Sequence, residues 1–85
     1  MYIVYILKSE RKSRRYIGHT DDIGERLKQH NRGRVRTSRY GMPWTVIYSE
    51  TCKTRSEAYR RELEIKSYKG GIKFKKLLGL WEDED

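Results

Sequence analysis

A run of β-branched and aromatic side chains fills residues 2–8 and contains no turn former. Such a run predicts a strand. A basic segment over residues 10–14 interrupts the run, and residues 15–18 predict a second strand that would form a hairpin with the first. Because the side chains of a strand alternate between its two faces, Tyr5 is expected to share a face with Ile3 and to lie opposite Val4.

Helical spacing replaces the strand pattern from about residue 21. Ile23 and Leu27 lie four residues apart, and the hydroxyl and acidic side chains of residues 20–22 can cap a helix N-terminus. The sequence therefore predicts a helix over about 22–31. Residues 32–43 follow with four arginines, two glycines and one proline. They predict a loop that is mobile without a ligand.

Strand and helix signals alternate again toward the C-terminus. Residues 44–49 predict a third strand, and a capping-box sequence at residues 54–57 begins a predicted second helix over about 54–68. A glycine pair ends that helix, and residues 72–80 predict a short third helix. The order of two strands, a helix, a strand and two helices predicts an α+β fold, in which helices flank a small three-stranded antiparallel sheet.

Length and composition indicate one small basic domain. The 85 residues leave room for a single core, so we expect one domain over residues 1–81, followed by a disordered acidic tail over residues 82–85. The chain carries 20 Lys and Arg against 12 Asp and Glu, a net charge of +8. This surplus favours a polyanionic partner, either nucleic acid or an anionic membrane surface, although it can also serve solubility alone.

The sequence predicts neither a membrane span nor a disulfide framework. No apolar run approaches the roughly 20 residues that cross a bilayer. Cys52 is the only cysteine, which fits a reducing compartment, so a cytoplasmic protein is expected. No base stands beside Cys52 in the sequence to activate it as a nucleophile.

Several polar side chains are candidates for chemistry because the predicted elements do not require them. A phosphodiester hydrolase needs a carboxylate for a divalent cation, an arginine for phosphate charge, and Tyr or His for proton transfer. Each candidate also has a structural interpretation. The two tyrosines can be core residues, Arg26 and His30 can be solvated on one helix face, and Glu62 can form a surface ion pair with Lys66. His19 is expected at the surface. The candidates are Tyr5, Tyr16, Arg26, His30 and Glu62.

The order of these residues resembles that of the GIY-YIG nuclease superfamily, in particular its small stand-alone, URI-type members. Ile3-Val4-Tyr5, ten residues and Tyr16-Ile17-Gly18 resemble the paired signature of that superfamily, with Ile3 in the place of its first glycine. Arg26 and His30 follow at the spacing that the family uses. Residues 56–66 resemble the family's second helix, in which a glutamate binds the metal.

The resemblance implies a divalent-metal-dependent endonuclease that hydrolyses phosphodiester bonds in DNA. Such an enzyme would be structure-selective or weakly sequence-selective and would act in repair, recombination or restriction. Glu62 would bind Mg²⁺ or Mn²⁺, and Arg26 would stabilise the phosphate in the transition state. Tyr5 and Tyr16 would orient or deprotonate the attacking water, with His30 assisting. Which group is the base stays open.

The resemblance also implies a structural role for Gly18 and a basic surface for nucleic acid. Gly18 would permit tight packing beside the active tyrosine. Tyr40 could stack on an unpaired base, whereas Trp44 is expected in the core. The basic side chains expected to neutralise phosphates are Arg32, Arg34, Arg36 and Arg39 in the loop and Lys73, Lys75 and Lys76 in the third helix.

The nucleic acid could be DNA or RNA, and no separate DNA-binding domain is expected beside the predicted one. Specificity would therefore come from the structure of the substrate or from a protein partner. One alternative is a non-cleaving nucleic-acid-binding module on the same fold. A third interpretation is an adaptor that binds an acidic protein.

Overall fold

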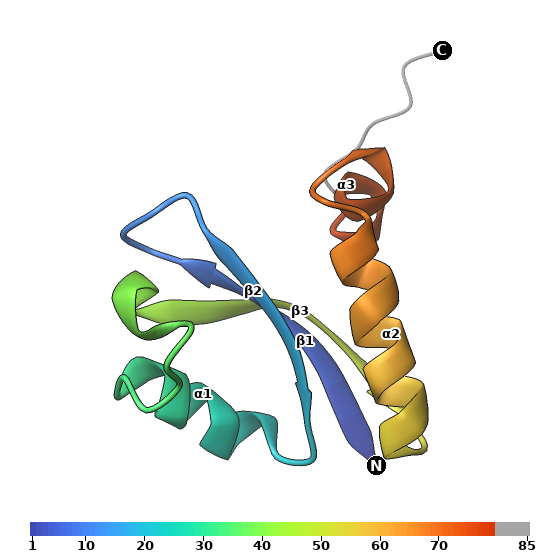
Figure 1. Ribbon diagram of the computed structural model, residues 1–85, viewed down its shortest axis with the longest axis horizontal. Helices are drawn as coiled ribbons and strands as arrows, with labels where there is room; N and C mark the ends of the chain where they lie inside the picture. Colours follow the sequence, from blue (N-terminus) through green and yellow to red (C-terminus); the bar gives the residue numbers. More distant parts are fainter. Residues whose placement is uncertain (80–85) are drawn as a thin grey trace.

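A three-stranded antiparallel sheet forms the centre of the computed structural model, which describes residues 1–79 (Figure 1). The central strand is β1 (Tyr2–Ser9). It pairs on one side with β2 (Arg15–Thr20) and on the other with β3 (Trp44–Cys52). The predicted hairpin is present as β1 and β2, and the predicted sheet is confirmed.

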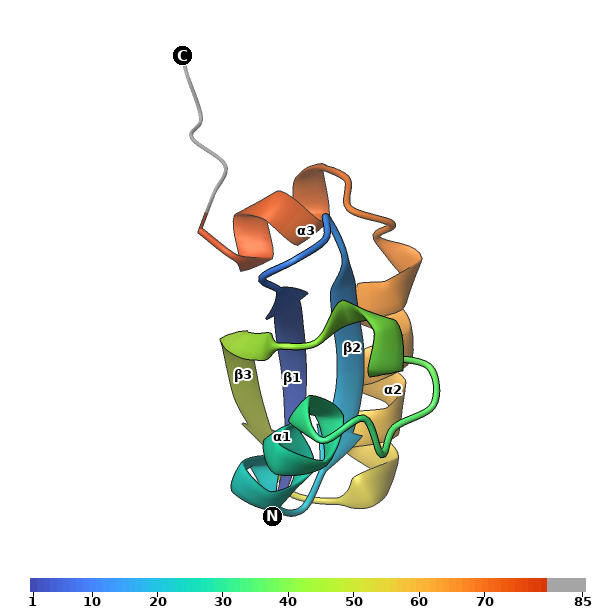
Figure 2. The same cartoon turned by 90° about the vertical axis from the view of Figure 1, so that its left-hand side faces the viewer.

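Helices cover both faces of this sheet (Figure 2). α1 (Ile23–Asn31) lies on one face, and α2 (Arg55–Ser67) and α3 (Ile72–Leu77) lie on the other. Asp22 caps α1 by accepting the backbone N–H of Glu25 at 3.0 Å. The predicted α+β class and the order ββαβαα are therefore confirmed.

The two faces of the sheet enclose separate cores. On the α2 face, Val4 and Ile6 pack with apolar side chains of α2 and α3, namely Ala58, Ile65 and Phe74. On the α1 face, Tyr5 and Leu7 pack with Trp44, and Ile3 joins the same cluster. The alternation predicted for β1 is confirmed, and so is the core position of Trp44.

The register of β1 and β2 decides which polar residues reach each face. Tyr5 is paired with Gly18, and Val4 is paired with His19. Directly paired residues of neighbouring strands point to the same face. Gly18 therefore lies on the α1 face with Tyr5, and His19 lies on the α2 face with Val4.

Several boundaries differ from the sequence prediction. β2 and β3 continue to Thr20 and Cys52, because pairing with β1 extends past the apolar segments that identified them. α3 ends at Leu77, shortly before Gly79 with its φ of 72°, whereas residue 80 lies outside the described residues. The predicted acidic tail at residues 82–85 lies outside them too. Within residues 1–79, no helix has the length and apolar character needed to cross a membrane.

The arginine-rich loop is more structured than the sequence predicts. Residues 39–41 form a short 3-10 helix, and Ser38 at its start is 1% exposed. The indole N–H of Trp44 donates to the carbonyl of Ser38 at 2.8 Å, while the amide of Asn31 holds the backbone of Trp44. The sequence predicted only a loop that is mobile without a ligand, because local polarity does not reveal contacts between residues several positions apart.

Candidate active site

The hydroxyl of Tyr5 is the centre of a buried polar cluster on the α1 face. It lies 2.9 Å from Nε2 of His30, and both side chains are no more than 1% exposed. Nε of Arg26 donates to the same hydroxyl at 3.5 Å, and Nη1 of Arg26 donates to Oε1 of Gln29 at 3.0 Å. Arg26 and His30 lie one turn apart on α1, so a single helix face places both beside one tyrosine.

Tyr16 joins this cluster through ring contacts. Its ring stacks on that of Tyr5 at a centroid distance of 6.3 Å and meets the His30 imidazole edge-on at 4.6 Å. The Trp44 ring also lies edge-on to Tyr16, at a centroid distance of 6.4 Å. Tyr16 is only partly buried, so it lies between the buried cluster and solvent.

Gly18 is required by the position of the Tyr5 ring. A Cβ atom at Gly18 would lie 2.7 Å from the Tyr5 hydroxyl oxygen and 3.0 Å from the Tyr16 ring. Contacts this short do not occur in folded proteins, so any larger side chain would displace the tyrosine hydroxyl. The tight packing implied by the family signature is present at this position.

The electrostatics of the cluster favour neutral Tyr5 and His30. Burial, helped by the positive charge of Arg26, lowers the pKa of His30 from 6.5 to about 4. Burial also raises the pKa of Tyr5, although the hydrogen bond from Arg26 opposes that effect. At neutral pH His30 is therefore an unprotonated imidazole with one ring nitrogen that can accept a hydrogen bond, and Tyr5 is a phenol that can donate one.

Glu62 lies on the α2 face, and both of its carboxylate oxygens are engaged. Oε1 is 2.6 Å from Nδ1 of His19, and Oε2 accepts from the Lys66 ammonium at 2.5 Å. Glu62 is 8% exposed, whereas Glu64 faces away and pairs with Arg61 on the surface. The helix thus turns Glu62 and not Glu64 toward the sheet, as the helical spacing predicts.

The Glu62 cluster and the Tyr5 cluster approach each other at the edge strand β2. Tyr16 and Ile17 line one open pocket together with Thr37 of the loop and Lys66 of α2. The negative charge of Glu62 is close enough to Tyr5 to raise the pKa of the phenol slightly. The structure therefore brings Tyr5, Tyr16, Arg26 and His30 into one cluster. Glu62 lies on the opposite face of the sheet, with His19 and Lys66 as its partners.

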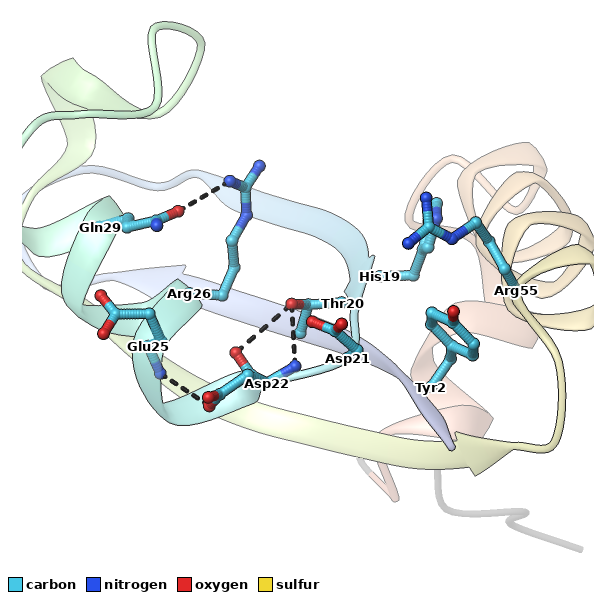
Figure 3. A pocket seen from close by; sticks show the side chains of 9 residues that line it. All are labelled: Tyr2, His19, Thr20, Asp21, Asp22, Glu25, Arg26, Gln29 and Arg55. Carbon is cyan, nitrogen blue, oxygen red and sulfur yellow. Dashed lines mark hydrogen bonds between the residues drawn. The ribbon is translucent and has the colours of Figure 1, made fainter.

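A second open pocket, of about 300 Å³, is lined by His19 and Thr20 at the C-terminal end of the same strand (Figure 3). The Arg26 guanidinium borders it from α1, and Arg55 of α2 lines it with its guanidinium over the Tyr2 ring, 5.2 Å from the ring centroid. Asp21, Asp22 and Glu25 also line it, so the pocket is mixed in charge. Arg26 and Arg55 can contact phosphates of one nucleic-acid strand only if that nucleic acid avoids the three carboxylates of the pocket.

A hydrated Mg²⁺ or Mn²⁺ fits Glu62 under one condition. Among residues 1–79, no three His, Cys, Asp or Glu side chains are grouped so that they could hold a metal ion. Mg²⁺ is commonly bound through one or two carboxylates, water and substrate phosphates, so one carboxylate is compatible with it. Because Lys66 occupies Oε2, the lysine would have to yield that oxygen to the cation.

The basic residues predicted to bind nucleic acid are all exposed, but they form two separate groups. The arginines at positions 32, 34, 36 and 39 belong to the loop on the α1 side of the sheet. The lysines at positions 73, 75 and 76 belong to α3 on the opposite side. Tyr40 is 72% exposed and can stack on a base, whereas buried Trp44 cannot.

Three side chains near the site had no recognisable function in the sequence. His19 was expected at the surface, but it contacts Glu62. Ser38 lies within a polar arginine-rich segment, and its Oγ is 2.6 Å from Nδ1 of His30. Arg55 lies within the capping-box sequence, which explained it as part of a helix start, but its side chain lines the pocket. Of the three, only His19 had a signal in the sequence, because it directly follows Gly18 of the signature.

The fold and the cluster of tyrosines, arginine, histidine and glutamate define a GIY-YIG domain. The family model of the GIY-YIG catalytic domain matches residues 1–75. UPF0213 proteins from Staphylococcus aureus strains Mu3 and COL are each 38% identical to this chain over 68 residues, covering 79% of this chain and 82% of theirs. The chain therefore belongs to the GIY-YIG family, and within it to the UPF0213 proteins.

A solved structure has the same architecture. The solution NMR structure of a UPF0213 protein from Bacillus halodurans matches with a TM-score of 0.57 and 29% sequence identity. The match covers 93% of this chain and 83% of that one. The sheet with helices in the order ββαβαα is thus shared with an experimentally determined relative.

Proposed function

We propose that this protein is a divalent-metal-dependent endonuclease that hydrolyses phosphodiester bonds in DNA. The observation that carries the proposal is the Tyr5 hydroxyl, which meets both His30 and Arg26 in a buried cluster beside Tyr16. Polar groups in a core are generally less favourable than apolar side chains of the same shape. Their presence in a core of this small size favours a chemical role.

In this proposal Tyr5 and His30 move the proton of the attacking water. The phenol gives its proton to Nε2 of neutral His30 and takes one from the water as that water attacks phosphorus. Arg26 donates hydrogen bonds to the phosphate oxygens as their charge increases. The bond from phosphorus to the leaving oxygen breaks, and that oxygen takes a proton from solvent. His30 then gives its added proton back to solvent through Tyr5, which restores the starting state.

Glu62 is the proposed metal ligand. A divalent cation bound there supplies electrostatic stabilisation of the phosphate charge. Glu62 would hold it from the α2 face, with His19 fixing the carboxylate through Oε1. Lys66 balances the charge of Glu62 when no cation does so.

The surroundings of the site support a substrate that is recognised by its backbone. Exposed loop arginines neutralise phosphates without reading sequence, so structure-selective or weakly selective cleavage is expected. Action on RNA, a protein partner that adds specificity, a role in repair, recombination or restriction, and a cytoplasmic location stay predictions.

A non-cleaving nucleic-acid-binding module is the second candidate. It is favoured by one observation: both oxygens of Glu62 already have partners within the protein. In that case Lys66 would be a permanent partner, and the exposed basic residues alone would carry the function.

Incubation of labelled duplex, single-stranded and branched DNA with the purified protein distinguishes the two. An endonuclease cuts at least one substrate with Mg²⁺ or Mn²⁺, Glu62→Ala abolishes cutting while retaining affinity, and the matched variant Glu64→Ala cuts normally. A binding module retains salt-dependent affinity and cuts nothing with either metal. Cutting by Glu62→Ala at the wild-type rate would remove Glu62 from the mechanism.

A further inference from the structure

His30 is held at both ring nitrogens by hydroxyl groups. Nε2 faces the Tyr5 hydroxyl at 2.9 Å, and Nδ1 faces the Ser38 hydroxyl at 2.6 Å. His30 is fully buried, and Ser38 and Tyr5 are each 1% exposed. Bulk water therefore has little access to either nitrogen, and the two hydroxyl groups decide which nitrogen carries the proton.

The surroundings of Ser38 give this hydrogen-bond chain a direction. The Ser38 hydroxyl donates to the carbonyl of Val35 at 3.3 Å, and a carbonyl can only accept. With its single proton directed there, the Ser38 oxygen accepts from N–H at Nδ1 of His30. A neutral imidazole carries one N–H, so Nε2 is left as an acceptor facing the Tyr5 phenol.

We propose that Ser38 is a positioning residue that holds His30 as the Nδ1–H tautomer, so that Nε2 accepts the proton of Tyr5. The tautomer depends only on the contacts of Ser38, His30 and Tyr5. Its effect on cleavage rests on the proposed function. In the opposite tautomer, Nε2 would carry a proton and could not accept the one that Tyr5 must release.

Ser38 also connects the basic loop to the buried cluster. It lies between Arg36 and Arg39, and its backbone carbonyl accepts from the indole of Trp44. Its backbone N–H donates to Val35 at 3.1 Å, so the backbone has two attachments that do not use the side-chain hydroxyl. Ser38→Ala is therefore expected to fold, with the two contacts of the hydroxyl, to His30 and to the carbonyl of Val35, removed.

Long-range proton–nitrogen NMR correlation of the imidazole at neutral pH reads the tautomer directly. The chain has only two histidines, so a His19→Gln variant assigns the signals of His30. In the wild type we expect a protonated Nδ1 and an unprotonated Nε2. Ser38→Ala should shift the population toward Nε2–H, the tautomer that free histidine prefers, and Ser38→Thr should restore Nδ1–H.

Ser67→Ala is the matched control. The Ser67 hydroxyl also donates to the carbonyl three residues earlier, but it belongs to the end of α2 and contacts no histidine. The His30 signals should be identical in this variant and the wild type. A wild type with the proton on Nε2, or Ser38→Ala with an unchanged tautomer, would overturn the proposal.

A cleavage assay separates this inference from the proposed function. If the protein cuts DNA, Ser38→Ala should lower kcat about 10- to 100-fold, with KM nearly unchanged, since the contact acts through the base and not through binding. Loss of affinity at an unchanged kcat would contradict it. If no substrate is cut, the proposed function fails, but the tautomer measurement still decides the role of Ser38.

Discussion

The two faces of the sheet contribute unlike parts of the candidate site. On the α1 face, Tyr5 and His30 are buried, neutral and hydrogen-bonded to fixed partners. On the α2 face, Glu62 is paired with Lys66, whose side chain is 49% exposed. A buried network holds its geometry without substrate, whereas an exposed lysine leaves an ion pair easily. The α1 face is therefore suited to orienting the reacting groups. The α2 face is suited to replacing the Lys66 ammonium with a metal ion.

A large effect is expected on the α1 face, at Arg26. Arg26→Ala should lower the single-turnover cleavage rate by about 10²- to 10³-fold, because a donor to developing phosphate charge is lost. Arg26→Lys should recover only part of the rate, since lysine lacks the planar fork of donors. The exposed residue Arg60 provides the matched control Arg60→Ala. Wild-type cutting by Arg26→Ala would show that this face does not act in the reaction.

The second prediction concerns the neutrality of the α1 face. The pKa of His30 is about 4 in the folded protein and 6.5 ordinarily. The unfolded chain therefore binds the proton more strongly, so His30 contributes stability above pH 6.5 that is lost as the pH falls toward 4. From pH 7 to pH 5 this loss is about 2 kcal/mol.

Urea unfolding at pH 7 and at pH 5 measures this loss in the free energy of unfolding. His30→Gln should show a smaller decrease in the free energy of unfolding than the wild type, by roughly that same 2 kcal/mol. An equal decrease in both proteins would mean that the buried imidazole is not the group that takes up the proton.

A smaller effect is expected from Lys66 on the α2 face. Lys66→Gln should tighten Mn²⁺ binding about threefold, because the cation no longer competes with an ammonium group whose exposed ion pair contributes less than about 1 kcal/mol. Electron paramagnetic resonance of free Mn²⁺ measures the affinity without DNA. Lys53→Gln should bind as the wild type does. Unchanged affinity in Lys66→Gln would mean that the metal does not take the place of this lysine.

The smallest effects separate the basic groups on the two sides. Arg34→Ala and Arg36→Ala should each reduce the slope of log affinity against log salt by about 1, as expected for the loss of one phosphate contact. Lys73→Ala and Lys75→Ala should reduce it less, because α3 lies across the sheet from α1, which carries Arg26. Fluorescence anisotropy with a short duplex gives the slopes. A larger change from the α3 variants would place the bound strand on the other face.

The parts of the fold that were predicted correctly depend on local signals. Alternation along β1 separated Tyr5 from Val4, and the Thr54 cap marked the start of α2, where the Thr54 side chain accepts the backbone N–H of Glu57. These signals depend on neighbouring residues and on the periodicity of a single element. They remain visible without knowledge of how the elements pack.

The contacts that were missed join distant segments. His19 and Glu62 are 43 residues apart, and their contact depends on how α2 is placed against β2. Ser38 reaches His30 only because Trp44 and Asn31 fold the arginine-rich loop back toward α1. No periodicity connects such positions, so the sequence predicted the candidate side chains but not the residues that hold them.

Dependence of cleavage on a divalent metal tests the central claim most directly. Labelled DNA is mixed with excess protein, first with Mg²⁺ or Mn²⁺, then with EDTA, and then with the metal restored beyond the chelator. The account predicts cutting, its complete loss, and its return, while DNA binding persists in EDTA. Cutting that continues in EDTA, or binding without cutting under every condition, would contradict it.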